Sequence, residues 1–209
     1  PQGEIGQQLF YEEANKVNTF ADRLLADCPD QFIDPIVFKL SLSEFSFMGQ
    51  LDDCSAKGLF NYRLSKAKGG DLLSIWCRHL VLNCLRPQGV MCESRWVTED
   101  IDIKLKVVAE PESLLLELLK VYWQGCQQAI PLFSKTSFAY AKAFLKNGKG
   151  DPDNSMMASW EGNKHTTGEM EDNYYQQLYK TTPLNDEFKK LAIAIYKPIH
   201  DHLEDPDKW

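Results

Sequence analysis

Two neighbouring segments carry polar residues of the types used in phosphate chemistry. A predicted strand ends at Gly49–Asp52, and after a short turn a second predicted strand reads Leu59–Arg63. Asn61 and Arg63 lie two residues apart, so both point to one face of that strand. In metal-dependent phosphodiester cleavage, two carboxylates hold Mg²⁺ against the phosphate and a lysine orients or activates water. The order of elements suits such a site, with Asp52 as the first carboxylate.

The residue types depart from that chemistry. Nucleases of the PD-(D/E)XK class need an aspartate on the first strand and an acid-x-Lys triplet on the second. Asn61 stands in place of the second acid, and Arg63 stands in place of the lysine. An amide binds Mg²⁺ poorly, and a guanidinium with a pKa above about 12 does not serve as a general base. We therefore predict degenerate nuclease positions, Asp52, Asn61 and Arg63, and no catalytic residue.

Other interpretations of these residues stay open. Asp52 is also typical of a turn acid beside Asp53, and Arg63 of a clamp on a phosphate or a carboxylate. A working Mg²⁺-dependent nuclease with migrated ligands is the alternative function. In that case an acid replaces Asn61 and a lysine replaces Arg63, the candidates being Glu44, Asp52 or Asp53 and Lys66 or Lys68.

The charge distribution indicates a basic region in an acidic chain. The net charge is -7, yet residues 57–86 carry six Lys or Arg side chains against one acid, Asp71. A local basic region suits a phosphate backbone. We predict the nucleic-acid-binding residues Lys57, Arg63, Lys66, Lys68 and Arg78. The alternatives are a solvated face, or pairing of Arg63 and Arg78 with acids within the protein or across a subunit interface.

Cysteine and histidine spacing does not indicate a metal site. The six cysteines form no C-x-x-C pair, so we expect reduced thiols with no zinc module and no disulfide framework. Among the four histidines only His200 and His202 lie close together in the sequence. We predict no bound metal.

Hydrophobic periodicity predicts a mixed α/β (α+β) fold. It indicates helices over 6–26, 71–85, 113–128, 136–146 and 184–203, strands within 32–51 and over 59–64, a hairpin within 90–108, and polar loops over 151–154 and 162–172. Asp71 is expected to cap the second helix. A mixed sheet flanked by helices buries these alternating faces. We predict a nuclease-like core over 1–110 and a helical C-terminal part over 111–209, packed on the core as one folded unit.

Composition sets the broad class. With 209 residues, 44% of them hydrophobic, the chain can bury a core. It contains no stretch of about 18 apolar residues and no signal peptide pattern near its start, so we expect a cytoplasmic protein with no membrane partner. Because Pro1 takes the place of a methionine, we expect a piece of a longer chain.

Aromatic residues in the C-terminal part indicate protein contacts. Large amphipathic rings in or beside polar loops often anchor interfaces; those in this chain are Trp160, Tyr174, Tyr175, Tyr179 and Trp209. We expect the region 155–180 to face a partner chain or to be partly mobile without one. The alternative for Trp160 and Tyr175 is that they pack loops against the helices.

The order of several motifs resembles a known family. Phe60–Leu80 combines Tyr62-Arg63, a Lys-x-Lys-Gly turn and a helix that bears a tryptophan. This run is similar to the C-terminal domain of RecC, the gamma chain of exodeoxyribonuclease V (RecBCD). Later segments fit as well, and the likeness covers essentially the whole chain: 114–119 before Tyr122, 131–141, 160–162, 172–175 and the closing helix after 183–184.

The resemblance implies a nuclease-like fold whose active site has decayed. It implies a domain that is not an enzyme alone, within an ATP-dependent exodeoxyribonuclease and helicase that processes double-stranded DNA ends. The expected partners are RecB-like and RecD-like subunits, which the domain scaffolds, and DNA. No cofactor is expected in this domain, because ATP and Mg²⁺ are used by the other subunits. Recognition of the Chi sequence does not carry over, since in the family it lies in a preceding part.

Overall fold

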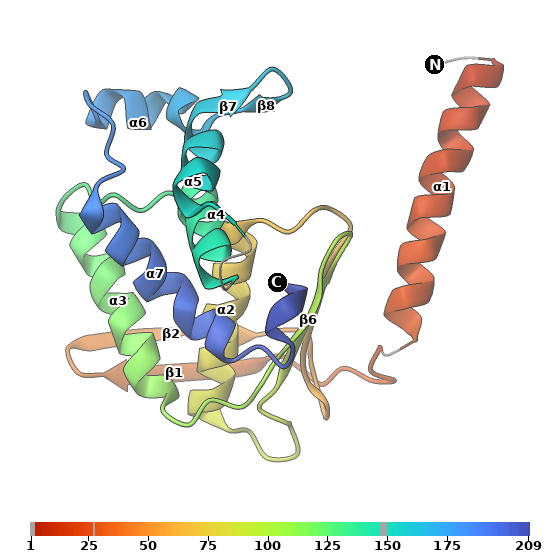
Figure 1. The fold of residues 1–209 in the computed structure, drawn as a ribbon. Helices are drawn as coiled ribbons and strands as arrows, with labels where there is room; N and C mark the ends of the chain where they lie inside the picture. The colour runs from red at the N-terminus through yellow and green to blue at the C-terminus, as the bar shows by residue number, and fades with distance from the viewer. Residues whose placement is uncertain (1–2, 27, 147–149) are drawn as a thin grey trace.

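The computed structural model describes residues 3–26, 28–146 and 150–209 (Figure 1). Its first part runs α1 (Glu4–Leu25), β1 (Ile36–Leu42), β2 (Phe45–Leu51), β3 (Cys54–Ser55), β4 (Gly58–Arg63), α2 (Gly69–Leu85), β5 (Ser94–Thr98) and β6 (Asp102–Leu105). The second part is mainly helical: α3 (Pro111–Gln127), α4 (Ser134–Leu145), α5 (Pro152–Glu161), α6 (Asn173–Leu178) and α7 (Asp186–Asp201). The predicted mixed α/β class is confirmed.

A four-stranded mixed sheet lies at the centre of the first part. Its strand order is β3-β4-β5-β6, with β4 and β5 parallel and the other pairs antiparallel. The parallel pair is joined through α2, as a crossover connection requires. β1 and β2 form a separate antiparallel hairpin. The alternating patterns therefore correctly predicted strands within 32–51, the strand β4 and the hairpin within 90–108.

The two faces of the sheet pack against different helices. Leu59, Trp96 and Ile103 belong to the main core, which also contains Trp76 of α2. The intervening residues Phe60 and Val97 point to the other face because side chains alternate along a strand. There they pack with Phe20 of α1.

The main core joins the two predicted parts of the chain. It includes Leu115 of α3, Ala141 of α4 and Ile195 of α7, together with the sheet and α2. Leu203, beyond α7, bridges to Leu105 of β6 and so extends the edge of the sheet. A single hydrophobic cluster thus spans the boundary at 110.

Helix α1 stands apart from the rest of the protein along most of its length (Figure 1). Phe20 near its C-terminal end is its buried residue, whereas Ile5, Phe10 and Val17 are exposed. The amphipathic pattern predicted this helix correctly. It did not show that most of the apolar side would be left uncovered.

Three local predictions are wrong. Lys68 is the N-cap of α2, and Asp71 lies inside its first turn. The expected loop at 151–154 begins α5, because the Asp151 carboxylate accepts a hydrogen bond from the amide of Asn154 and caps the helix. The segment 162–172 contains the short strands β7 (Gly162–Asn163) and β8 (Thr166–Thr167) and a 3-10 turn over Glu169–Glu171.

Two further expectations concern reduced cysteines and the absence of a membrane-spanning segment. All six cysteines are free thiols, and burial raises the pKa of Cys77 and of Cys84 to about 11. No helix in the described ranges is long and apolar enough to span a bilayer.

Candidate functional site

Two of the three predicted nuclease positions, Asn61 and Arg63, line a cleft between β4 and α2, which we call the β4–α2 cleft. Asn61 and Arg63 point to the same face of β4, as predicted, and that face looks toward α2. They line a hollow of about 170 Å³ with Asp71 and Arg78 of α2 and Trp96 of β5. The two acids that follow β2 reach it through hydrogen bonds described next.

Arginine side chains pair with the acids of the cleft. The Arg63 guanidinium lies 2.7 Å from an Asp71 carboxylate oxygen. Arg78 donates to the backbone oxygen of Asp52 at 2.8 Å and lies 3.4 Å from the Asp53 carboxylate. The Asn61 amide donates to the same Asp53 oxygen at 3.3 Å.

Asp53, and not Asp52, is the acid that meets Asn61. The Asp52 carboxylate accepts a hydrogen bond from Gln50 at 3.2 Å. Asp53 has φ 61, a left-handed conformation that aspartate tolerates better than most residues. Its backbone oxygen accepts from the amide of Phe60 at 2.9 Å, which fixes the turn between β2 and β3 against β4.

The donor set does not suit Mg²⁺. A magnesium site needs carboxylate or carbonyl oxygens and room for water, whereas here an amide nitrogen and a guanidinium point at Asp53. Among residues 3–26, 28–146 and 150–209, no three His, Cys, Asp or Glu side chains are placed to hold a metal ion together. We derive no catalytic step through a metal in this cleft.

The predicted basic residues do not form one surface. Arg63 and Arg78 line the cleft, while Lys66 and Lys68 are exposed in the loop between β4 and α2. Lys57 precedes β4 at its opposite end, about 20 Å from Arg63 at the usual rise of a strand. In the cleft, the two arginines are balanced by Asp53 and Asp71.

Glu44, a candidate migrated ligand, lies far from the cleft. It occupies the turn between β1 and β2, so the length of β2, about 25 Å, separates it from the turn after that strand. A hydrogen bond from Ser43 is the main cause that lowers the pKa of Glu44, and its backbone and the charge of Lys120 contribute.

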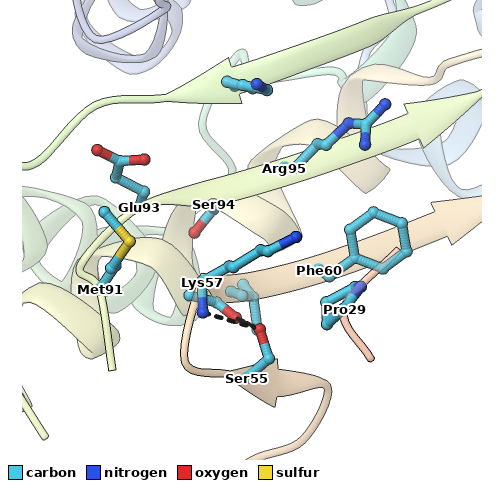
Figure 2. Close-up of a pocket in the computed structure, with 11 residues that line it drawn as sticks. Pro29, Ser55, Lys57, Phe60, Met91, Glu93, Ser94 and Arg95 are labelled. Atoms are coloured by element: carbon cyan, nitrogen blue, oxygen red, sulfur yellow. Dashed lines mark hydrogen bonds between the residues drawn. The ribbon is translucent and has the colours of Figure 1, made fainter. Parts of the chain in front are cut away.

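Lys57 lines a second hollow, the β4–β5 pocket, of about 210 Å³ (Figure 2). Figure 2 shows its side chain extended along the pocket toward Phe60, and its backbone amide donates to Ser55 at 3.1 Å. Arg95 also lines the pocket but is bound to Asp102 through two hydrogen bonds of 3.0 and 2.8 Å. That contact lowers the pKa of Asp102 despite its partial burial.

These ion pairs match the alternative in which Arg63 and Arg78 pair with acids within the protein. Arg63 and Asp71 come from a strand and from the helix after the next loop, and Arg78 and Asp53 are 25 residues apart. Spacing along the sequence does not indicate which acid each arginine meets, because the partners come together only in the folded chain.

The fold and the cleft define a class of domain: a mixed α/β unit with a polar cleft beside a parallel strand pair, whose acids are bound by arginines. The family described as the RecC C-terminal domain matches residues 1–145. The chain belongs to this family. The match crosses the predicted boundary at 110 and extends through α4.

Two curated relatives are proteins called "RecBCD enzyme subunit RecC". The one from Buchnera aphidicola subsp. Acyrthosiphon pisum (strain APS) is 23% identical over 181 residues, 81% of this chain. The one from Buchnera aphidicola subsp. Schizaphis graminum (strain Sg) is 23% identical over 174 residues, 79% of this chain. In both cases the chain spans 16% of the relative's length.

Proposed function

We propose that this chain is a non-catalytic, nuclease-like domain of a RecBCD-type helicase and nuclease that processes double-strand DNA ends for recombinational repair. In this role it scaffolds RecB-like and RecD-like subunits and contacts DNA. ATP and Mg²⁺ serve the other subunits. Membership of the RecC C-terminal domain family supports the assignment to such a complex, and the names of the curated relatives agree with it.

The order of elements supports the nuclease-like part of the proposal. A hairpin (β1 and β2) is followed by β4, then α2, then β5 parallel to β4. This order puts Asn61 and Arg63 beside α2, where an acid and a lysine two residues apart would face a shared metal. The likeness to the PD-(D/E)XK fold rests on this order and on the spacing of the two residues.

The ion pairs of the β4–α2 cleft carry the non-catalytic part. Arg78 and Asn61 both reach the Asp53 carboxylate, and Arg63 reaches Asp71. These contacts use the acids that a metal would need, and a guanidinium does not take a proton from water at neutral pH. Replacing Asn61 with an acid therefore does not suffice for metal binding, because Arg78 remains beside Asp53.

Metal binding and DNA cleavage test this proposal with a graded set of variants. We expect neither Mg²⁺ binding by calorimetry nor Mg²⁺-dependent cleavage for the unmodified chain. The double variant Asn61→Asp/Arg63→Lys should stay near that baseline. Adding Arg78→Leu should release Asp53 and give weak binding, at about millimolar Mg²⁺, because two carboxylates then share the cleft.

Asn18→Asp is the matched control, since it adds one carboxylate at an exposed position of α1, outside the cleft. It should not change metal binding. Cleavage by the unmodified chain, abolished by chelation and by Asp53→Asn, would overturn the non-catalytic assignment. Equal Mg²⁺ binding by the double and triple variants would show that Arg78 does not block the site.

A further inference from the structure

The β4–β5 pocket, on the face of the sheet opposite α2, gathers cations from three elements. Lys57 comes from the turn before β4, Arg95 from β5 and Lys104 from β6. Glu93 supplies the one carboxylate of the lining. The side chains around this hollow of about 210 Å³ therefore carry a net positive charge.

The strand register places these cations side by side. Phe60 of β4 pairs with Arg95, and Arg95 pairs with Lys104 across β5 and β6. Because paired residues of adjacent strands point to the same face, Arg95 and Lys104 are neighbours there. Lys57 approaches from the other side, and Figure 2 shows its side chain extended toward Phe60. In the same view the Glu93 carboxylate lies well apart from the Lys57 ammonium.

Asp102 holds Arg95 without adding its own charge to the lining. Two hydrogen bonds of 3.0 and 2.8 Å bind the Arg95 guanidinium to the Asp102 carboxylate. The guanidinium also lies 5.7 Å from the centroid of the Phe60 ring. Asp102 itself does not line the pocket. Arg95 is therefore a fixed positive charge on the pocket wall.

The two lysines are not neutralised by ion pairs. Lys104 also borders a neighbouring hollow lined by Glu204 and Asp205, but it forms an ion pair with neither of them. Within residues 3–26, 28–146 and 150–209, no acid forms an ion pair with Lys57. Both ammonium groups are therefore available to an anion in the pocket.

The backbone around the pocket is held by its own hydrogen bonds. The amide of Leu59 donates to the backbone oxygen of Glu93 at 3.0 Å, and the amide of Met91 donates to that of Ala56 at 3.0 Å. Gly58 has φ 102, and a Cβ at this position would clash with the backbone oxygen of Glu93. Glycine permits this close approach. The pocket therefore exists before a ligand binds, so binding does not have to order its backbone.

We infer that the β4–β5 pocket binds a phosphate group of a nucleic-acid strand, with the ammonium groups of Lys57 and Lys104 on its oxygens. A phosphate presents oxygens in several directions, which suits cations that arrive from three elements, and a lysine binds it as a point charge. The volume is below the 300 Å³ or so that drug-sized ligands need, so the pocket suits one phosphate and not a whole nucleotide. Met91, 52% exposed, offers apolar contact to the adjoining sugar or base. This site deepens the proposed DNA contact and rests on the proposed function for the source of the phosphate.

Inorganic phosphate and a short single strand test the pocket in the 209-residue chain. We expect sodium phosphate to shift the NMR signals of the Lys57 and Gly58 amides and of the Met91 methyl group, relative to sodium chloride at equal ionic strength. A thymidine octanucleotide without terminal phosphates should shift the same signals at lower concentration. If neither probe shifts them, the pocket does not bind phosphate. If inorganic phosphate shifts them and the octanucleotide does not, a nucleic-acid strand is not the source.

Charge variants measure the contribution of each side chain to octanucleotide binding. Lys57→Gln and Lys104→Gln should each weaken binding about threefold. Together they should flatten the slope of log affinity against log salt by about 0.7, the value for one phosphate contact on a single strand. Glu93→Gln should tighten binding about two- to fivefold, because it removes the carboxylate of the lining. A slope change twice as large would mean two separate phosphates and would overturn the shared site.

Lys208→Gln is the matched control. Lys208 borders the neighbouring hollow together with Lys104 and does not line the β4–β5 pocket. It removes the same charge from the same side of the protein and should leave octanucleotide binding nearly unchanged. If it weakens binding as much as Lys57→Gln does, the effect is one of overall charge and the inference fails. None of these variants alters the β4–α2 cleft, so the metal-binding and cleavage assays fail or succeed separately.

Discussion

His79 fixes α2 against the sheet and thereby places its neighbour Arg78 in the cleft. The imidazole is fully buried, with Nδ1 2.7 Å from the Ser94 hydroxyl of β5 and Nε2 3.0 Å from the backbone oxygen of Lys106. A carbonyl only accepts, so Nε2 carries the proton and Nδ1 accepts from Ser94. The ring also stacks on Trp76, with centroids 5.5 Å apart. These contacts require a neutral imidazole.

Acid should therefore destabilise the fold through His79. Burial lowers the pKa of His79 from 6.5 to about 4; the charge of His202 adds to this effect, and the hydrogen bond to Lys106 opposes it. Above pH 6.5 the imidazole is neutral in both states. Between pH 6.5 and 4 the unfolded chain takes up the proton and the folded chain does not, so the free energy of unfolding falls. The loss amounts to about 2 kcal/mol at pH 5 and levels off near 3 kcal/mol below pH 4.

Urea unfolding at pH 7.5 and at pH 5 measures this loss. His79→Gln should lower the free energy of unfolding at pH 7.5 by about 1–3 kcal/mol, because buried polar partners lose their hydrogen bonds. Its further loss at pH 5 should be about 2 kcal/mol smaller than in the unmodified chain. His165→Gln, at an exposed position of the β7–β8 turn, should leave the pH dependence unchanged. A loss between pH 7.5 and 5 that is the same with and without His79 would refute the reasoning.

Two further predictions concern DNA and partner proteins. If the exposed lysines of the β4–α2 loop contact phosphates, Lys66→Glu/Lys68→Glu should weaken DNA binding at low salt and flatten its salt dependence, whereas Lys197→Glu on α7 should have little effect in a filter-binding assay. Hydrogen exchange should show that amides of α6 gain protection when the chain joins its complex. Amides of α5, which packs on α4, should be equally protected in both states. Equal protection of α6 in both states would contradict a partner at that surface.

The alternation of apolar and polar residues predicted the strands, because it depends only on neighbouring positions in the sequence. Alternation from Phe38 to Phe47 predicted the strands that form β1 and β2, and alternation within 90–108 predicted the hairpin of β5 and β6. The same rule put Asn61 and Arg63 on one face of β4. The frame of the candidate site was therefore predictable, because it depends on strand geometry and on the order of strand, loop and helix.

Features that depend on distant partners were not predictable in this way. Trp160 lies in a polar stretch of sequence, yet it is buried in α5 because Phe133 and Tyr175 pack on it. Trp209, at the chain end, is buried on Phe138 of α4. Two of the five expected interface anchors are thus core residues. In helix α1, by contrast, apolar residues that the pattern placed on a buried face are exposed. An apolar face in the sequence does not indicate whether other residues of this chain pack against it.

In the β4–α2 cleft, arginines supply positive charge to the acids in the way that a metal ion would. A divalent cation between carboxylates neutralises them and also activates water. Arg63 and Arg78 supply the first effect and not the second, because a guanidinium stays protonated and has no exchangeable water ligand. The pairs are half exposed, so each adds little stability. They nevertheless balance the charges of Asp53 and Asp71, and the Arg63–Asp71 pair links β4 to α2. Under the proposed function, selection on this cleft would act on its shape and charge balance. Replacing one partner of a pair would change the nearby surface more than it would change the stability of the whole fold.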